Sequence, residues 1–272
     1  MRHSERYIVF GGPLGNLGAL EGLKALTEGV GPNHIICTGD VAGYFARPRE
    51  CYELIKKWGI PVVAGNVEEQ LAADADDCGC GFTVGSTCDI LSDAWYSHTK
   101  SEISEENLAY IKTLPGVCRF EIAGKKVAAI HGGYPETNQF IFPSTDWTVK
   151  KEIIDRLGVD IVLAGHSGIA FTEVRDGKVW CNAGAIGLPT NDGTSRVWYT
   201  EISAELDRIL FETKSFQYDY GPDQIAMRAA GLPDGYTEAL ETGLWPSAEI
   251  LPEEEKRQTG KVRAEESLQI DT

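Results

Sequence analysis

Four Gly-containing turns of this 272-residue chain carry side chains that can bind a metal ion. Each turn follows a short apolar run, and together they present one carboxylate, one carboxamide and two imidazoles: Asp40, Asn66, His131 and His166. Oxygen and nitrogen ligands of these kinds suit Mn, Fe, Zn, Co or Ni, and the neighbouring glycines allow the backbone to approach an ion closely. One such residue alone would more often cap a helix or make a structural hydrogen bond. The four together predict a metal site.

The elements that must position these side chains are short strands and amphipathic helices in alternation. This pattern predicts an α/β or α+β domain, in which the carboxyl ends of strands gather at one sheet edge and bind ligands. We expect strands over residues 7–10, 35–38, 62–64, 161–164, 196–202 and 209–213, hairpins over 118–130 and 170–182, and helices over 17–28, 49–58, 149–157 and from Ser104 to a stop at Pro115-Gly116.

The motifs around the candidate ligands occur in a characteristic order. They read Gly12-Pro13-Leu14-Gly15-Asn16, Gly39-Asp40, Gly65-Asn66-Val67-Glu68, His131-Gly132 and Gly165-His166-Ser167-Gly168. Over roughly residues 6–215 this order resembles the calcineurin-like metallophosphoesterase superfamily, nearest to its YfcE-type and diadenosine-tetraphosphatase-related bacterial branch. The resemblance implies a four-layer α/β/β/α sandwich of two mixed sheets flanked by helices. It also implies a metal-dependent hydrolase of the phosphoesterase type.

The departures from the family pattern fall on one metal site. In similar proteins two metals share the aspartate at Asp40. The resemblance places the other ligands of the first metal at Gly12, Leu14 and Gly168, none of which can bind one through its side chain. It places the second metal on Asp40, Asn66, His131 and His166, all of which are present. We therefore expect one divalent or trivalent transition metal, drawn from Mn, Fe, Zn, Co and Ni.

A second departure concerns catalysis. The histidine that assists the leaving group in the family is replaced by Val67, whereas its carboxylate partner remains as Glu68. We expect Glu68 or His98 to act as general acid or base, and Asn16, Gly12 and Gly132 to bind substrate. Two functions stay open: a mononuclear hydrolase of a small phosphate ester or related ester, and a catalytically inactive protein that binds a metal or ligand for a regulatory role.

A Cys/Gly-rich insert at about residues 74–90 contains Cys78, Cys80 and Cys88. These three thiols could bind a structural zinc, form one disulfide, simply pack in the core, or reach the metal site and replace its missing ligands. The chain contains seven cysteines, an odd number, and several of them lie in apolar segments, so a disulfide framework is not expected.

The charge balance limits the partners. With 25 Lys and Arg against 41 Asp and Glu, the formal charge is -16, which argues against nucleic-acid or anionic-membrane binding through broad electrostatics. Neither a membrane span nor a signal peptide is evident, so we expect a soluble cytoplasmic protein that acts on a small molecule, with self-association into a homo-oligomer left open.

The composition divides the chain into a main domain, residues 1–231, and an acidic extension, residues 232–272. We expect the extension to be partly docked and its end, from about Glu253, to be disordered. Trp245 is too apolar for a free tail and should pack on the domain or on a partner subunit.

Overall fold

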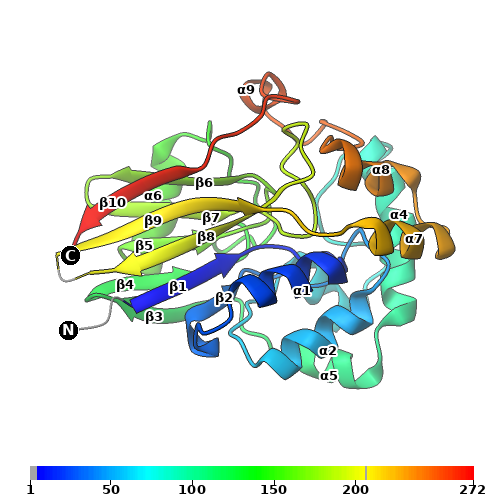
Figure 1. Cartoon of the computed structure of the whole chain (residues 1–272), viewed down its shortest axis with the longest axis horizontal. Helices are drawn as coiled ribbons and strands as arrows, with labels where there is room; N and C mark the ends of the chain where they lie inside the picture. The colour runs from blue at the N-terminus through cyan, green and yellow to red at the C-terminus, as the bar shows by residue number, and fades with distance from the viewer. Residues whose placement is uncertain (1–4, 206) are drawn as a thin grey trace.

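Two five-stranded mixed sheets lie face to face in the computed structural model, which describes residues 5–205 and 207–272 (Figure 1). The first sheet has the order β10-β9-β8-β1-β2 and the second has the order β3-β4-β5-β7-β6. The strands of the first sheet are β1 (Glu5–Phe10), β2 (Ile35–Cys37), β8 (Val197–Ala204), β9 (Arg208–Phe216) and β10 (Glu266–Asp271). Those of the second are β3 (Cys118–Ile122), β4 (Lys125–Ala129), β5 (Ile161–Ala164), β6 (Ala170–Arg175) and β7 (Lys178–Ala183).

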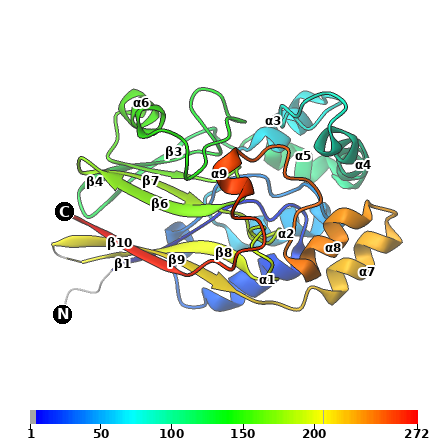
Figure 2. The same ribbon diagram turned by 90° about the horizontal axis from the view of Figure 1, so that it is seen from above.

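Helices cover the outer faces of both sheets (Figure 2). Helix α6 (Trp147–Leu157) packs on the second sheet, and α1 (Leu17–Leu26) and α2 (Pro48–Trp58) pack on the first. The remaining helical segments are η1 (Pro32–His34), α3 (Asn66–Ala73), α4 (Thr87–Glu102), α5 (Glu105–Ile111), α7 (Gly221–Ala229), α8 (Asp234–Thr242) and α9 (Glu253–Lys256).

Alternation along the strands divides the core between the layers. On β1, Tyr7 and Val9 face the second sheet, whereas Ile8 and Phe10 face the helices outside the first sheet. Trp180 of β7 packs outward with the residues of α6. The expected four-layer α/β/β/α arrangement is therefore confirmed.

The strand expected over residues 62–64 is a single bridge between Cys37 and Val62. Pro61 has no N–H to extend a ladder, and the chain enters α3 directly after Gly65, the N-cap of that helix. The backbone hydrogen bonds of this short segment still run to two neighbours, from Val63 N to Cys37 O at 3.1 Å and from Ala64 N to Pro115 O at 2.8 Å.

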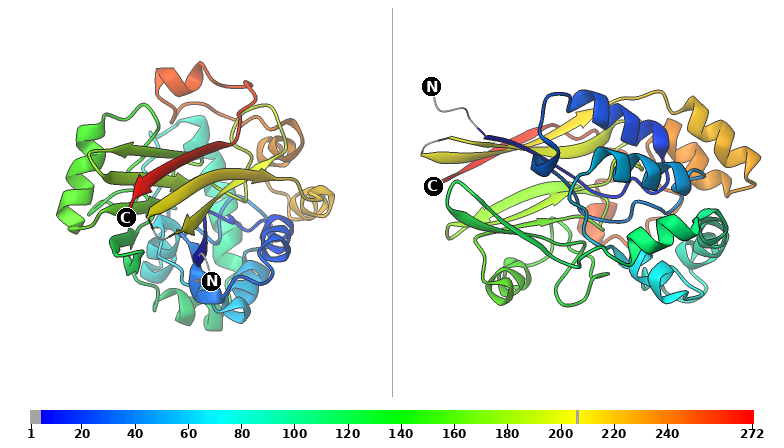
Figure 3. Two further views of the ribbon diagram at one scale, coloured as in Figure 1. Left: turned by 60° about the vertical axis from the view of Figure 1, so that its left-hand side comes forward. Right: turned by 90° about the horizontal axis from the view of Figure 1, so that it is seen from below.

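The expectation of a disordered chain end is wrong. Strand β10 pairs antiparallel with β9 along Glu266 to Asp271 and becomes the edge of the first sheet (Figure 3). Ile270 is buried between the sheets, and backbone pairing holds its exposed neighbours in place. Trp245 packs on the main domain, as expected, so residues 232–272 complete the fold rather than trail from it.

Among the residues that the structure describes, no helix is long and apolar enough to cross a membrane.

Candidate metal centre

The four expected ligands lie at the ends of neighbouring elements. Asp40 follows β2, Asn66 begins α3, His131 follows β4 and His166 follows β5. Asp40 and His166 adopt left-handed backbone conformations, with φ of 54° and 63°. Glycine is required at position 39, directly before Asp40, because its φ is 95° and a Cβ there would lie 2.9 Å from His131 Nδ1. The sharp turns therefore direct side chains from separate segments to one point.

That point is His131 Nε2. It lies 3.1 Å from Asp40 Oδ2, 3.1 Å from Asn66 Oδ1 and 3.0 Å from His166 Nδ1. Asp40 and His131 are buried, and Asn66 is also closed off from solvent. The structure thus brings all four expected ligands together.

The hydrogen bonds around the cluster indicate that it is built for a cation. His131 Nδ1 lies 2.6 Å from Thr38 O, a carbonyl that can only accept, so Nδ1 bears the proton of the neutral ring. Asn66 Nδ2 donates to Cys78 O at 2.8 Å, which directs Asn66 Oδ1 to the cluster. In the neutral ring, the lone pair of His131 Nε2 therefore faces two further acceptors, the side-chain oxygens of Asp40 and Asn66, and a bound metal ion would relieve their mutual repulsion. The residues present fit such an ion.

The charges of the cluster agree with this description. Burial lowers the pKa of His131, but the Asp40 carboxylate outweighs burial and raises it above its usual value. Burial raises the pKa of Asp40, and His131 reverses this and lowers it. Burial, followed by the charge of His131, lowers the pKa of His166 to about 3. A proton on His131 therefore occupies the position that a metal would take, while His166 stays neutral.

We predict that metal affinity falls as the pH decreases through the raised pKa of His131. One proton competes with the ion for Nε2, so the apparent affinity should drop about tenfold for each pH unit below that value. Equilibrium dialysis against chelator-buffered Zn²⁺ or Mn²⁺ at pH 8, 7, 6 and 5 measures it. An affinity that is constant over this range would show that His131 is not a ligand.

Glu68 is placed differently from a catalytic acid or base. Its Oε1 accepts from Val41 N at 2.8 Å and from Tyr52 Oη at 2.6 Å, and its Oε2 accepts from Asp40 N at 2.8 Å and Gly65 N at 2.7 Å. Burial and the Asp40 carboxylate raise the pKa of Glu68, whereas these hydrogen bonds oppose the shift. With both oxygens occupied, Glu68 holds the Asp40 turn against the start of α3 and does not contact the space beside the ligands.

Three other expected site residues also have structural roles. His98 lies on α4 with Nε2 3.0 Å from Ala46 O, outside the cavity at the metal centre. Asn16 is the N-cap of α1, and its Nδ2 donates to Gly187 O at 2.8 Å. A Cβ on Gly132 would meet Thr137 O at 2.6 Å, so this glycine permits close backbone packing. Of the expected substrate-binding residues, Gly12 alone lines the cavity.

The insert brings two of its thiols beside Asn66. Cys78 Sγ and Cys80 Sγ lie 2.7 Å apart, and Cys80 Sγ is 3.3 Å from Asn66 Nδ2. Cys88 belongs to α4 and bonds to Ser247 instead. Within the described residues, the group of three His, Cys, Asp or Glu ligand atoms found within 4.8 Å of one another is Asp40, His131 and His166. The structure therefore does not assemble the three thiols as a zinc site, and all seven cysteines are free.

We predict that replacing Cys78, Cys80 and Cys88 together by serine leaves the metal content unchanged, at about one ion per chain. Serine preserves the size and weak hydrogen bonding of each thiol but removes its affinity for zinc. Elemental analysis of both proteins purified in parallel is the measurement. A loss of one equivalent in the triple variant would assign a metal to the insert.

A comparison with protein families shows the superfamily of the chain. Residues 15–205 match the model of the calcineurin-like phosphoesterase superfamily domain. The chain belongs to this superfamily.

Relatives and solved structures are similar over most of the chain, and the solved structures share its fold. The uncharacterized protein MJ0912 of Methanocaldococcus jannaschii is 29% identical over 221 residues, covering 72% of this chain and 84% of that protein. A metallophosphoesterase from Sphaerobacter thermophilus has a TM-score of 0.67 at 21% identity, covering 89% of this chain and 100% of the other. The hypothetical protein PH1004 from Pyrococcus horikoshii OT3 has a TM-score of 0.71 at 18% identity, covering 88% of this chain and 99% of the other. The finer assignment to the YfcE-type branch stays a prediction.

The positions that would hold the first metal of the superfamily are filled by apolar side chains. Leu14 is buried, and a Cβ on Gly12 would lie 3.0 Å from its Cδ2. The indole of Trp245 covers Gly168, where a Cβ would lie 3.0 Å from Cζ2. The sequence predicted that Trp245 packs on the domain or on a partner subunit, but not that it covers Gly168, which lies far from it along the chain.

Proposed function

We propose that this chain is a metal-dependent hydrolase of a small phosphate ester or related ester that works through one transition metal. The proposed ligands are Asp40, Asn66, His131 and His166. The observation that carries this proposal is the convergence of two side-chain oxygens and one ring nitrogen on His131 Nε2 at 3.0 to 3.1 Å. Superfamily membership supports the reaction class.

The residues of this chain prepare the site for hydrolysis. A bound ion would polarise the phosphoryl or carbonyl oxygen and lower the pKa of water. Thr38 O fixes the ring of His131, and Glu68 fixes the turn that carries Asp40. Hydrolysis adds the water oxygen to phosphorus or carbonyl carbon and breaks the bond to the leaving oxygen. That oxygen departs with the bonding electrons and takes its proton from water.

The alternative is a protein that binds a metal or ligand without turnover. Two observations favour it. Leu14 and Trp245 occupy the region where the superfamily would hold its first metal, and Val67 replaces the histidine that assists the leaving group. Two-metal hydrolysis uses one ion on each side of the reaction, so the loss of one slows it.

The deciding experiment is a substrate panel on protein stripped of metal and reloaded with Mn, Fe, Zn, Co or Ni. The panel contains phosphomonoesters, phosphodiesters, dinucleoside polyphosphates and thioesters. We expect turnover of at least one class, abolished by chelator and by Asp40→Asn but not by Asp74→Asn, which changes an exposed acid. Stoichiometric metal binding without turnover of any class would favour the non-catalytic alternative.

A further inference from the structure

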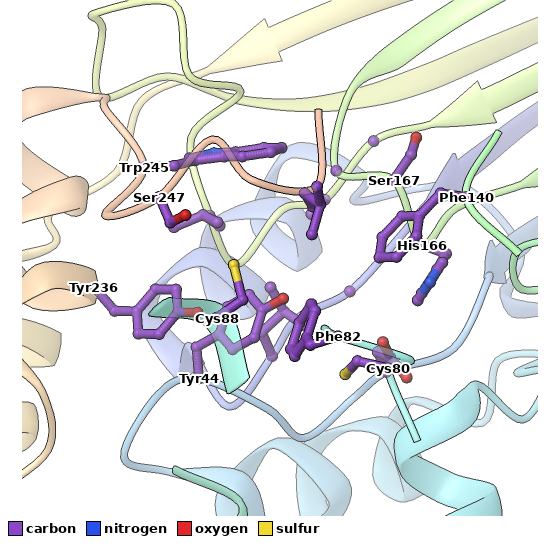
Figure 4. A pocket seen from close by; sticks show the side chains of 18 of the residues that line it. Tyr44, Cys80, Phe82, Cys88, Phe140, His166, Ser167, Tyr236, Trp245 and Ser247 are labelled. Carbon is purple, nitrogen blue, oxygen red and sulfur yellow. The ribbon is translucent and has the colours of Figure 1, made fainter. Parts of the chain in front are cut away.

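A cavity opens beside the metal centre, and several aromatic side chains line it (Figure 4). Asp40, His131 and His166 line one end. The rings come from separate parts of the chain: Tyr44, Phe82, Phe140, Tyr236 and Trp245. Because Tyr236 lies on α8 and Trp245 follows that helix, the C-terminal extension forms part of the cavity wall.

These rings are held in fixed positions by other contacts. Tyr44 and Tyr236 stack with centroids 4.4 Å apart and planes 8° apart. Phe140 stacks on His166 at 4.2 Å. Trp245 Nε1 donates to Pro189 O at 2.6 Å, and its backbone N donates to Asn191 Oδ1 at 2.9 Å. A ligand that stacks on these rings therefore pays little for ordering them.

Away from the metal centre, the cavity offers no cationic side chain among the described residues. Neither lysine nor arginine is among the described residues that line it. Ser247 at its wall donates to Glu249 at 2.9 Å, which places a further acid near this wall. An anionic group bound away from the metal would lose its hydration without gaining a cationic partner. The cavity therefore favours ligands whose only charge is at the metal.

The residues expected to act as general acid do not line this cavity, which favours a leaving group that needs no proton. Glu68 uses both oxygens in hydrogen bonds, His98 lies outside the cavity, and Val67 cannot donate a proton. A phenol has a pKa of about 10, well below that of an alkyl alcohol, so its oxyanion can leave without protonation. An aromatic leaving group meets both the chemical need and the shape of the wall.

We propose that the substrate is an aryl ester whose ring binds among Tyr44, Phe140, Tyr236 and Trp245 and whose only charged group is the reacting one. The proposal rests on the proposed function in placing a metal at Asp40, His131 and His166. It is tested by binding, so turnover is not needed to decide it.

The test compares three phosphonates on the full chain loaded with Zn²⁺, with isothermal titration calorimetry as the measurement. Benzylphosphonate should bind about tenfold more tightly than methylphosphonate, because the ring stacks on the aromatic wall. Adding a para carboxylate to the benzyl ring should weaken binding about tenfold, because that charge has no partner. Equal affinity for benzyl and methyl, or undiminished affinity for the carboxylate, would overturn the proposal.

The variants test whether the preference arises at the cavity wall. In Trp245→Ala the ratio of the affinity for benzylphosphonate to the affinity for methylphosphonate should fall to below about threefold. Trp245→Phe should restore most of this ratio. Trp58→Ala, on α2 outside this cavity, should leave the ratio unchanged. The ratio compares two ligands on one preparation, so partial unfolding does not alter it.

The outcomes separate this inference from the proposed function. An intact benzyl preference without hydrolysis of any ester would contradict only the hydrolase assignment. Hydrolysis with equal binding of benzyl and methyl phosphonates would contradict only the aryl specificity. A metal-loaded protein that binds none of the three phosphonates would also contradict the aryl specificity.

Discussion

Replacing His131 by alanine is expected to reduce the metal content from about one ion per chain to below about 0.1, and to lower ester hydrolysis at least a thousandfold. The reason is geometric. Asp40 Oδ2, Asn66 Oδ1 and His166 Nδ1 all contact His131 Nε2. Removing this ring therefore removes the central atom of the proposed ligand set. Elemental analysis and initial rates on the same preparation measure both effects.

His98→Ala is the matched control for this variant. His98 is a half-buried histidine whose ring, like that of His131, lies within hydrogen-bond distance of a backbone carbonyl. It lies on α4, outside the cavity. Its metal content and rate should equal those of the unmodified protein. His131→Gln, which keeps most of the side-chain volume, shows whether any loss comes from unfolding. A His131→Ala protein that retains its metal would refute the ligand assignment.

The convergence of Asp40, His131 and His166 was predictable because each of them follows a strand. A residue directly after a short apolar run lies at the edge of a sheet, and Gly39 and Gly65 mark turns there. The order of the motifs then selected Asp40, His131 and His166 from the other acids and histidines. The structure adds the roles of Thr38 and Tyr52. The first acts through its backbone carbonyl, which no side-chain motif records.

The roles of individual motif residues were less predictable. Glu68 and Asn16 lie in matched motifs, yet the side chains of both make hydrogen bonds to other parts of the fold, which residue type does not reveal. The position of His98 along the chain predicted that it lies near the site. On α4, however, its ring faces the backbone carbonyl of Ala46.

Contacts made by the C-terminal extension could not be predicted from composition. Strand β10 is held by backbone pairing with β9, and its exposed charged residues look like those of a disordered tail. Trp245 was expected to pack, but its partner Gly168 became apparent only in three dimensions. The same segment that was read as peripheral thereby covers Gly168 and forms part of the cavity wall.

Glu68→Ala is expected to destabilise the protein by about 3 to 5 kcal/mol, even without metal. The substitution leaves the backbone N–H groups of Asp40, Val41 and Gly65 without their acceptor in a buried region, together with the hydroxyl of Tyr52. Urea unfolding of metal-free protein, followed by circular dichroism, measures the loss.

Glu69→Ala provides the control, because Glu69 is the next residue on α3 and is exposed; its free energy of unfolding should change by no more than about 0.5 kcal/mol. Glu68→Gln should fall between the two, since an amide has one oxygen to accept where the carboxylate has two. Glu68→Ala and Glu68→Gln together also decide whether Glu68 acts as a catalytic group or holds Asp40 in place. If Glu68→Ala unfolds at the same urea concentration as the unmodified protein but loses turnover, Glu68 is a catalytic group after all. If stability and metal affinity fall together, and Glu68→Gln recovers part of both, its contribution is to hold Asp40 in place for the ion.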